Sequence, residues 1–244
     1  MYDFFDLYDC ICGNISSDAS ISCAIPGRVW ALAETENSSG AAMLTSGTSR
    51  PNMLSDSMSG LSLREAAQAV KSWRFEEASL ALAAANAFYN TTERLSLLGC
   101  EEPFENYCTR GIDFCGKTVC IVGHMHGTRE MHRCAKDIFI LEREPRDGDY
   151  PDSACDFLLP KCDIVLITGS SIINKTLPHL LELCRSAYTI LVGPSVPMCP
   201  ELLDFGIDRL SGLVITDRAG MHEHCIAGTP GSPYGYGKPF LLIK

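Results

Sequence analysis

The segment Asp163-Ile-Val-Leu-Ile-Thr-Gly-Ser-Ser171 is a short run of mostly β-branched apolar residues followed at once by glycine and serine. An apolar run bounded by turn residues predicts a strand that is buried on both faces of a sheet. Comparable runs occupy residues 118–122, 137–141 and 189–192, with helix-like segments between them at about 129–135, 176–184 and 200–205. Such alternation is typical of a parallel sheet in an α/β fold. Residues 212–216 and 240–243 are expected to add two strands, the last at an edge.

The first 95 residues have a different pattern, which predicts a smaller α+β unit. Apolar residues have helix-like spacing over residues 2–14, and they alternate loosely over 20–45, which fits two or three antiparallel strands. Residues 45–60 are rich in Ser, Gly and Asn and are expected to form a loop. Ser62 and Glu65 have the spacing of a capping box at the start of a helix, and an alanine-rich helix follows over 76–89.

Residues 96–114 contain glycine and proline and have no sustained hydrophobic period, so they are expected to form a linker. The sequence therefore predicts an N-terminal α+β domain over residues 1–95 and a parallel-sheet domain over residues 115–244.

Composition excludes several classes of protein. The chain has 244 residues, of which 46% are hydrophobic and 20% charged, so it is not an extended disordered chain. Its net charge of −10 disfavours nucleic acid and anionic membrane surfaces as partners. The acidic N-terminus lacks the basic segment of a secretory signal, and no apolar run approaches the length of about 18 residues that spans a bilayer. A cytoplasmic location is expected.

The thirteen cysteines are odd in number and scattered over the whole chain, so we interpret them as reduced thiols. Cys120, Cys162 and Cys184 lie within apolar runs, where a free cysteine serves as a small hydrophobic residue of the core.

Glycine and small polar residues follow three of the predicted parallel strands. The first strand ends in Gly123, the third in Thr168-Gly169-Ser170, which leads to Asn174 and Thr176, and the fourth in Gly193-Pro194-Ser195. Ligands of open parallel sheets bind at the carboxyl ends of the strands, where glycine lets the backbone approach and helix N-termini attract anions. The loops predict a site for a phosphate, a carboxylate or a nucleotide-like ligand.

The glycine spacing after the first strand is not G-x-G-x-x-G, so a plain NAD enzyme is disfavoured. Glu142 and Glu144 stand near the end of the second strand, where an acid could hold a ribose or could simply be solvated. Ser195 lacks the G-x-S-x-G pattern of a nucleophile, and Thr176 is interpreted as a helix cap that leaves Asn174 free to face the ligand.

The histidines form two H-x-H pairs, each expected in a loop. His124 and His126 are the first, and His222 and His224, followed by Cys225, are the second. In extended backbone an H-x-H pair places both imidazoles on one side, and imidazole with thiolate or carboxylate suits Zn, Ni, Cu or Fe. These residues are candidate metal ligands; the alternative is that they are ordinary polar histidines of loops.

Several segments together resemble a known family. They are Asp163-Ile-Val-Leu-Ile-Thr-Gly-Ser-Ser-Ile-Ile-Asn-Lys-Thr-Leu177, Leu191-Val-Gly-Pro-Ser-Val-Pro197, Phe205-Gly-Ile-Asp-Arg-Leu-Ser-Gly212 and Val214-Ile-Thr-Asp217. This set resembles the putative heavy-metal chelation domain family of prokaryotes. Glu77-Ala-Ser-Leu-Ala-Leu-Ala-Ala-Ala-Asn-Ala87 is similar to that family's companion domain, which has an enolase-N-terminal-like fold.

The resemblance implies a Rossmann-like C-terminal domain, a smaller α+β domain packed against it, and a cleft between the two. The residues of this chain that match the family's motifs, and that it therefore implies for the cleft, are Gly123, Thr168, Gly169, Asn174, Thr176, Gly193, Pro194 and Ser195.

Two functions are expected from these observations. The first is a cytoplasmic protein that binds a transition metal or a metal chelate in the cleft, with His124 and His126 as first ligands and His222, His224 and Cys225 as further candidates. The second is an enzyme, a transferase or lyase, that holds a small anionic metabolite or nucleotide-like ligand at the loops 168–171 and 193–195.

The alanine-rich helix has small residues around much of its circumference. We therefore expect it to be buried against the C-terminal domain or against a second copy of the chain. A C2 homodimer is predicted because it is the commonest closed assembly, with a compact monomer as the alternative.

Overall fold

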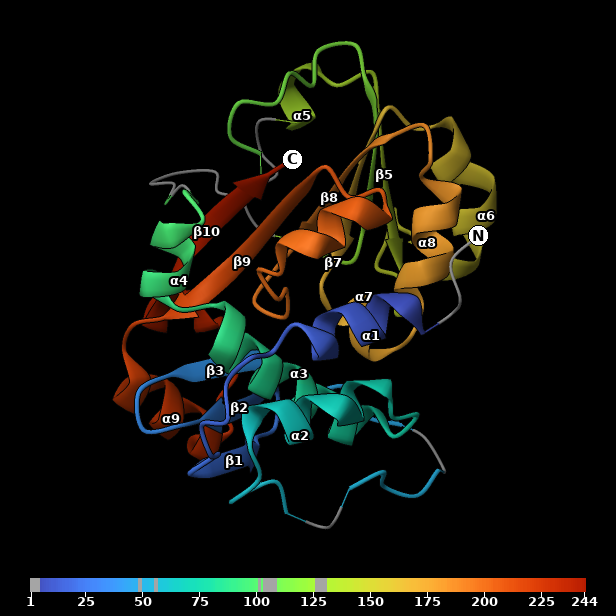
Figure 1. Ribbon diagram of the computed structural model, residues 1–244. Coiled ribbons are helices and arrows are strands. Elements are labelled where there is room, and N and C mark those ends of the chain that lie inside the picture. Colours follow the sequence, from blue (N-terminus) through green and yellow to red (C-terminus); the bar gives the residue numbers. More distant parts are fainter. Residues whose placement is uncertain (1–4, 48–49, 55–56, 101, 103–108, 126–130) are drawn as a thin grey trace.

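The structure is a computed structural model, and it describes residues 5–47, 50–54, 57–100, 102, 109–125 and 131–244. Within these residues, a large sheet has seven strands in the order β10-β9-β8-β7-β4-β5-β6 (Figure 1). The strands are β4 (Thr118–Val122), β5 (Asp137–Glu142), β6 (Tyr150–Pro151), β7 (Ile164–Thr168), β8 (Tyr188–Val192), β9 (Arg209–Ile215) and β10 (Gly237–Ile243). Only β10 runs antiparallel to its neighbour. The predicted α/β fold and its edge strand are confirmed.

Both faces of the central strands are covered, which explains their unbroken apolar runs. On β7, Val165 and Ile167 join the main core, while Ile164 and Leu166 pack on the opposite face in a smaller apolar cluster with Met131. Successive side chains of a strand point to opposite faces, so a strand buried on both faces needs apolar residues at every position.

A second, antiparallel sheet has the order β1-β2-β3, as the sequence predicts. Its strands are β1 (Cys23–Pro26), β2 (Trp30–Glu34) and β3 (Ser39–Met43). The helices of this half are α1 (Asp6–Gly13), α2 (Leu63–Ala67), the 3₁₀ turn η1 (Gln68–Lys71), α3 (Phe75–Tyr89) and α4 (Thr92–Leu97). The predicted capping box is present, because the Glu65 amide donates to the Ser62 hydroxyl and the Ser62 amide donates to the Glu65 carboxylate.

Helix α3 is the alanine-rich helix, and its own chain covers most of it. It packs on β2 and β3 and against α2, and its alanines at positions 78, 81, 83, 84, 85 and 87 are all buried. Gly40 of β3 lies directly against the backbone of Ala83 and Ala87. Asn90, the C-cap, donates to the carbonyls of Val196 and Leu213 in the other half. The predicted burial of this helix is therefore found within one chain, and the homodimer stays a prediction.

The second half has the short helices α5 (Met131–Cys134), α6 (Cys155–Leu158), α7 (Ser170–Ile173), α8 (Leu177–Leu183) and α9 (Arg218–Ala227), and the 3₁₀ turns η2 (Asp152–Ala154), η3 (Leu159–Lys161), η4 (Pro200–Phe205) and η5 (Pro233–Tyr236). The expected helix over 200–205 is thus a 3₁₀ turn.

Helix α9 is a correction, because its residues were expected to form a loop. Its two ends carry ordinary signals: the Asp217 side chain accepts from the Gly220 amide, and Gly228 ends the helix in the left-handed region. Met221, His224 and Cys225 form its buried face at helical spacing. Because histidine and glycine replace the usual apolar residues, its hydrophobic period is weak.

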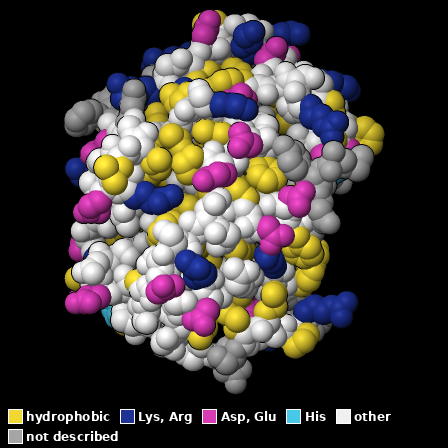
Figure 2. Space-filling model, in the orientation of Figure 1, with side chains coloured by type: hydrophobic (Ala, Val, Ile, Leu, Met, Phe, Trp, Pro, Cys, Tyr) yellow, Lys and Arg dark blue, Asp and Glu magenta, His cyan; other side chains and the backbone are white. Residues whose placement is uncertain are grey.

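The twelve described cysteines are all free thiols, and Cys120, Cys162 and Cys184 are buried as predicted. None of the helices in the described part of the chain has both the length and the apolar character needed to cross a membrane. On the face shown in Figure 2, acidic and basic side chains are interspersed, which is the pattern of a solvated surface.

Candidate functional site

The order of the strands in the large sheet reverses at β4. The chain continues from β4 to β5 on one side, and it returns to β7 on the other side. Such a reversal leaves a crevice at the carboxyl ends of the two strands, where ligands of open α/β sheets bind. The loop after β4 begins with Gly123, and the loop after β7 begins with Gly169. Two of the predicted glycine loops therefore flank this point.

The three glycine loops lie together at this edge. A Cβ atom on Gly123 would come within 2.9 Å of the Thr168 methyl group, and the Gly169 amide donates to the Val192 carbonyl directly before Gly193. Gly123 and Gly193 both have positive φ angles, 96° and 125°, which favour glycine.

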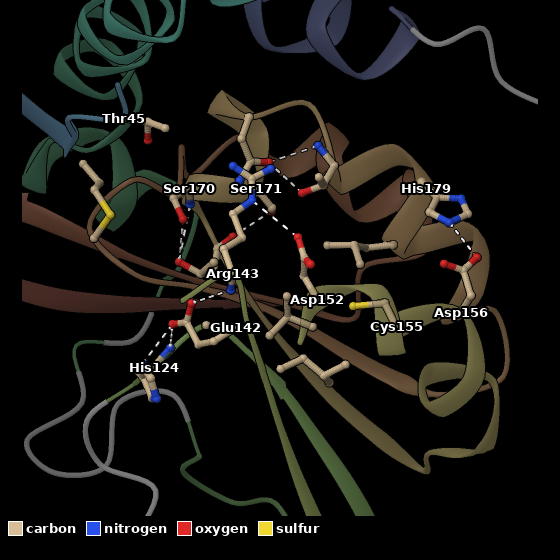
Figure 3. Close-up of a pocket in the computed structure, with 18 residues that line it drawn as sticks. Thr45, His124, Glu142, Arg143, Asp152, Cys155, Asp156, Ser170, Ser171 and His179 are labelled. Atoms are coloured by element: carbon tan, nitrogen blue, oxygen red, sulfur yellow. Dashed lines mark hydrogen bonds and ion pairs between the residues drawn. The ribbon is translucent and has the colours of Figure 1, made fainter. Parts of the chain in front are cut away.

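A cavity of about 310 Å³ opens between this edge and the end of β3 (Figure 3). Of the residues predicted for the cleft, five line it: Gly123, Thr168, Ser170, Asn174 and Thr176. Gly193 and Pro194 line an adjoining cavity of about 300 Å³, which shares Met43, His124 and Thr168 with the first.

Gly169 and Ser195 line neither cavity. A Cβ atom on Gly169 would lie 2.9 Å from the Ser195 carbonyl carbon, so glycine is needed for packing between the two loops. The Ser195 hydroxyl is buried and accepts from the Met43 amide at 2.8 Å. Ser195 therefore ties β3 to the edge of the large sheet.

The side chains of Asn174 and Thr176 contact each other. The Asn174 carbonyl oxygen Oδ1 accepts from the amide and the hydroxyl of Thr176, at 3.1 and 2.6 Å. Thr176 stands at the start of α8 but makes no side-chain cap. The predicted Thr176 cap is thus wrong, whereas Asn174 lines the cavity as predicted, with its amide oxygen engaged by Thr176.

His124 is held between two carboxylates. Its ring nitrogen Nδ1 lies 3.0 Å from Glu142 Oε1, and its Nε2 lies 2.8 Å from Asp149 Oδ2. The His124 amide also donates to Glu142, at 2.7 Å, and the Arg146 amide donates to Asp149, at 2.8 Å. These contacts fix the ring at the border of the two cavities. Of the two carboxylates suggested for a ribose, Glu142 and Glu144, the first is thus occupied by this histidine.

The Arg146 amide, and next the His124 side chain, lower the pKa of Asp149 below its ordinary value, so Asp149 is an anion at neutral pH. Sequence reasoning found His124 but missed Asp149, because nothing in the pattern of residues 143–149 relates them to the loop after β4.

Other charged groups surround the first cavity. Arg143 Nε lies 3.7 Å from Asp152, and His179 Nε2 lies 3.0 Å from Asp156, on the other side of the cavity from His124 (Figure 3). The hydroxyls of Thr168 and Ser170 are 3.1 Å apart. The cavity therefore offers charges of both signs and hydroxyl groups to a polar ligand.

Lys175 is buried behind the loop that holds Asn174 and Thr176. Its ammonium group donates to the carbonyls of Val70 and Ile173, at 2.7 and 2.8 Å, and burial lowers its pKa to about 7. Its φ of 67° is unusual for a residue other than glycine.

The second histidine pair lies elsewhere. His222 and His224 are on α9, where residues two apart point to different sides, so the prediction that both imidazoles face one way is wrong. His224 is buried beside Thr229 and Tyr236, and Cys225 packs in an apolar cluster with Trp30. His222 contacts Glu34 instead, at 2.6 Å. His126 lies outside the described residues.

Two family models match the chain. Both are described as "Putative heavy-metal chelation"; one, DUF364, matches residues 112–234, and the other, DUF4213, matches residues 8–89. The chain belongs to the DUF364 family. The family resemblance noted in the sequence is therefore confirmed.

Solved structures of DUF364 proteins agree with this fold. A crystal structure of a DUF364 protein of unknown function from Desulfitobacterium hafniense DCB-2 has 34% sequence identity and a TM-score of 0.88, and the match covers 99% of this chain and 98% of that one. A second, from Pyrococcus horikoshii, has 20% identity and a TM-score of 0.82 over 98% of this chain and 100% of that one, and shows the likeness in fold.

An uncharacterized protein of Methanocaldococcus jannaschii is 35% identical to the chain over 108 residues. The match covers 41% of this chain and 42% of that protein, so it spans less than half the length of this curated relative.

Proposed function

We propose that the chain binds a transition metal together with a small chelating ligand in the cleft at the carboxyl edge of the large sheet. The observation that carries the proposal is the imidazole of His124, which is held between Glu142 and Asp149. The description of the DUF364 family model, "Putative heavy-metal chelation", supports the same chemistry.

The two carboxylates suit different roles. A histidine that binds a metal through one nitrogen usually donates its other N–H to a carboxylate, which fixes the ring and its tautomer. Glu142, which also accepts from the His124 amide, is suited to this supporting role at Nδ1. Nε2 and Asp149 are then the pair that would hold the metal.

The separation of this pair is close to what a metal needs. Two ligand atoms of a tetrahedral zinc ion are about 3.3 Å apart, because each bond is about 2.0–2.1 Å long. His124 Nε2 and Asp149 Oδ2 are 2.8 Å apart, so a small movement of either side chain would accommodate the ion. Imidazole and carboxylate together suit Zn²⁺ and other first-row transition metals.

Two protein ligands leave coordination positions for a small molecule. His124 lines both cavities whereas Asp149 lines neither, so the small molecule would reach the metal past the His124 ring. The cavity of about 310 Å³ has room for it, and the guanidinium of Arg143, whose Nε lies 3.7 Å from Asp152, is suited to the carboxylate of a chelating compound. His126, two residues further along the sequence, stays a candidate further ligand from the sequence alone. A metal chelate, rather than a bare ion alone, is therefore the ligand that we propose.

We also infer that this cleft lies between two domains, an N-terminal one over residues 1–95 and a C-terminal one over residues 115–244, joined by a linker over 96–114. The support is that Met43 and Thr45 line the cavity from the first and His124 and Thr168 from the second.

A second candidate function is that of a transferase or lyase acting on a small anionic ligand. An imidazole oriented by carboxylates is also suited to move protons in general acid–base catalysis. The hydroxyls of Thr168 and Ser170 and the guanidinium of Arg143 would then hold the anion.

The proposal predicts that zinc stabilises the chain through His124. A metal that binds only the folded state, and whose free concentration is 100 times its Kd, adds about 2.7 kcal/mol to the free energy of unfolding. We expect Zn²⁺ to raise the melting temperature of tag-free, metal-depleted protein, and we expect His124→Ala and Asp149→Asn to lose most of this increase. His179→Ala is the matched control, because His179 also lines the cavity and contacts a carboxylate but only through one nitrogen.

The melting experiment is best performed in a Cys23→Ser background. This change removes the thiol from a separate group of possible metal ligands, Cys23, Glu34 and His222. An equal zinc-induced increase in His124→Ala and in the parent would contradict the proposal. Stabilisation by nucleotides, S-adenosylmethionine or small phosphates without any effect of metal would favour the enzyme instead.

A further inference from the structure

We propose that Cys23, Glu34 and His222 form a second metal site, for a divalent transition metal of the zinc type, outside the cleft. The three residues offer a thiol, a carboxylate and an imidazole, and their ligand atoms all lie within 4.8 Å of one another. The site shares no residue with the cleft, so this inference does not rest on the proposed function.

The backbone brings the three residues together from rigid elements. Cys23 and Glu34 are directly paired in the register of β1 and β2. Paired residues of antiparallel strands project from the same face, with Cβ atoms about 5 Å apart. Helix α9 packs against β1 and β2 through its buried face, and it lies beside these strands in Figure 1. His222 therefore reaches the pair from a third element.

The distances suit a zinc-sized ion. His222 Nδ1 is 2.6 Å from Glu34 Oε2, and the thiol of Cys23 completes the group within 4.8 Å. In a tetrahedral zinc site with bonds of about 2.0–2.3 Å, the ligand atoms are roughly 3.3–3.7 Å apart. Side-chain movements that lengthen the His222–Glu34 separation would bring the three ligand atoms to the spacing of a bound state.

A supporting network fixes the carboxylate of Glu34. The Ser39 hydroxyl donates to Glu34 Oε1 at 3.1 Å and accepts from Arg218 Nε at 2.9 Å. Arg218 is itself held by the carbonyls of Thr35 and Glu36, at 2.5 and 2.8 Å. Oε1 is thus occupied while Oε2 faces His222, which is the arrangement of a ligand carboxylate oriented by hydrogen bonds.

Solvent can reach the cluster from one side. The side chain of Glu34 is 11% exposed, whereas that of His222 is 35% exposed. A groove of about 340 Å³ is lined by Glu34, His222, Arg218 and Glu223. This groove gives a metal ion a path to Glu34 and His222, although Cys23 does not line it, and it leaves room for water or a small molecule at a fourth position.

The chemistry of the donors selects the metal. An ion pair between His222 and Glu34 would explain two of the residues, but it gives no reason for a thiol opposite Glu34. Thiolate and imidazole ligands favour zinc and similar ions over Mg²⁺ and Ca²⁺, which prefer oxygen. Cys225 is no part of the site, because it packs among Trp30 and Leu32 in the core.

The test is a titration of the reduced, tag-free, metal-depleted full chain with Co²⁺. A thiolate bound to Co²⁺ gives a charge-transfer absorption band in the near ultraviolet, whereas the ligands in the cleft, imidazole and carboxylate, give none. We expect the wild-type chain to develop this band with one equivalent of Co²⁺, and Cys23→Ser to lose it. Ser39→Ala removes only a supporting hydrogen bond and is expected to weaken Co²⁺ binding about 10- to 100-fold.

Controls make the outcome decisive. Cys100→Ser, at a half-buried thiol outside the cluster, and His124→Ala, in the cleft, are both expected to retain the band. Equal free energies of unfolding for the metal-free variants and the wild type establish that they fold. Absence of the band in the wild type, or its persistence in Cys23→Ser or with unchanged affinity in His222→Ala, would overturn the proposal without touching the cleft.

Discussion

Gly40→Ala is expected to lower the free energy of unfolding by about 4 kcal/mol or more, or to prevent folding altogether. A Cβ atom at this position would overlap the Ala87 nitrogen and the Ala83 oxygen. Both are backbone atoms of α3, so no side chain can rotate away, and the strand and the helix would have to separate. Overpacking of this kind is among the few causes of such large effects.

Urea unfolding of Gly40→Ala and of a matched control, Gly13→Ala, measures this effect. Gly13 ends helix α1, and a Cβ atom there meets nothing within 4 Å. We expect the control to change stability by less than about 1 kcal/mol, with a gain if anything, because alanine restricts the unfolded chain. A Gly40→Ala protein as stable as the control would contradict the close packing of β3 on α3.

The same substitution is expected to disturb the proposed cleft. Strand β3 ends at Met43, whose amide donates to Ser195 and whose side chain borders both cavities. Displacement of β3 would therefore open the wall of the proposed cleft, and loss of metal binding is expected to accompany the loss of stability.

Lys175 predicts a strong dependence of stability on pH. Burial lowers its pKa from 10.5 to about 7 in the folded chain. Between about pH 7 and pH 10.5 the unfolded chain therefore binds a proton that the folded chain does not, and the free energy of unfolding rises with pH in this range. The contribution of neutral Lys175 to the free energy of unfolding is fully present above the pKa of the unfolded chain, and it is lost as the pH falls to about 7.

The measurement compares the wild type with Lys175→Met at several pH values. One pH unit of proton linkage corresponds to about 1.4 kcal/mol, so between pH 7 and pH 10 the difference in unfolding free energy should move by about 4 kcal/mol in favour of the wild type. Lys136→Met, at a lysine whose side chain is 68% exposed, is the control and is expected to leave the pH profile unchanged. If the difference in unfolding free energy between the wild type and Lys175→Met did not change with pH, burial would not lower the pKa of Lys175.

Much of the fold could be predicted because its signals are local. The apolar runs at 118–122 and 164–168 are unbroken because both faces of these strands are covered, and their alternation with helix-like segments indicates a parallel sheet. The loops after these strands could be placed at one edge because parallel strands share a direction. Helix α9 could not be placed by period, since only its caps, Asp217 and Gly228, mark it clearly.

The candidate sites were harder to predict, because their partners come from separate elements. His124 stood out as a histidine after a strand, but Asp149 is brought to it only by the turn that follows β5. Cys23 and Glu34 carry no motif, and only the register of β1 and β2 makes them neighbours. The prediction for His222 and His224 was wrong because the two side chains of an H-x-H pair point to the same side in a strand but to different sides in a helix.

The proposed function of the cleft requires a metal ion beside His124. The most direct measurement is anomalous diffraction from crystals of the chain soaked in Zn²⁺. We predict an anomalous peak at bonding distance, about 2.0–2.2 Å, from both His124 Nε2 and the Asp149 carboxylate, and its loss in crystals of His124→Ala. Zinc peaks elsewhere in the crystal, including one at Cys23 and His222, with none at His124, would contradict the proposed function of the cleft.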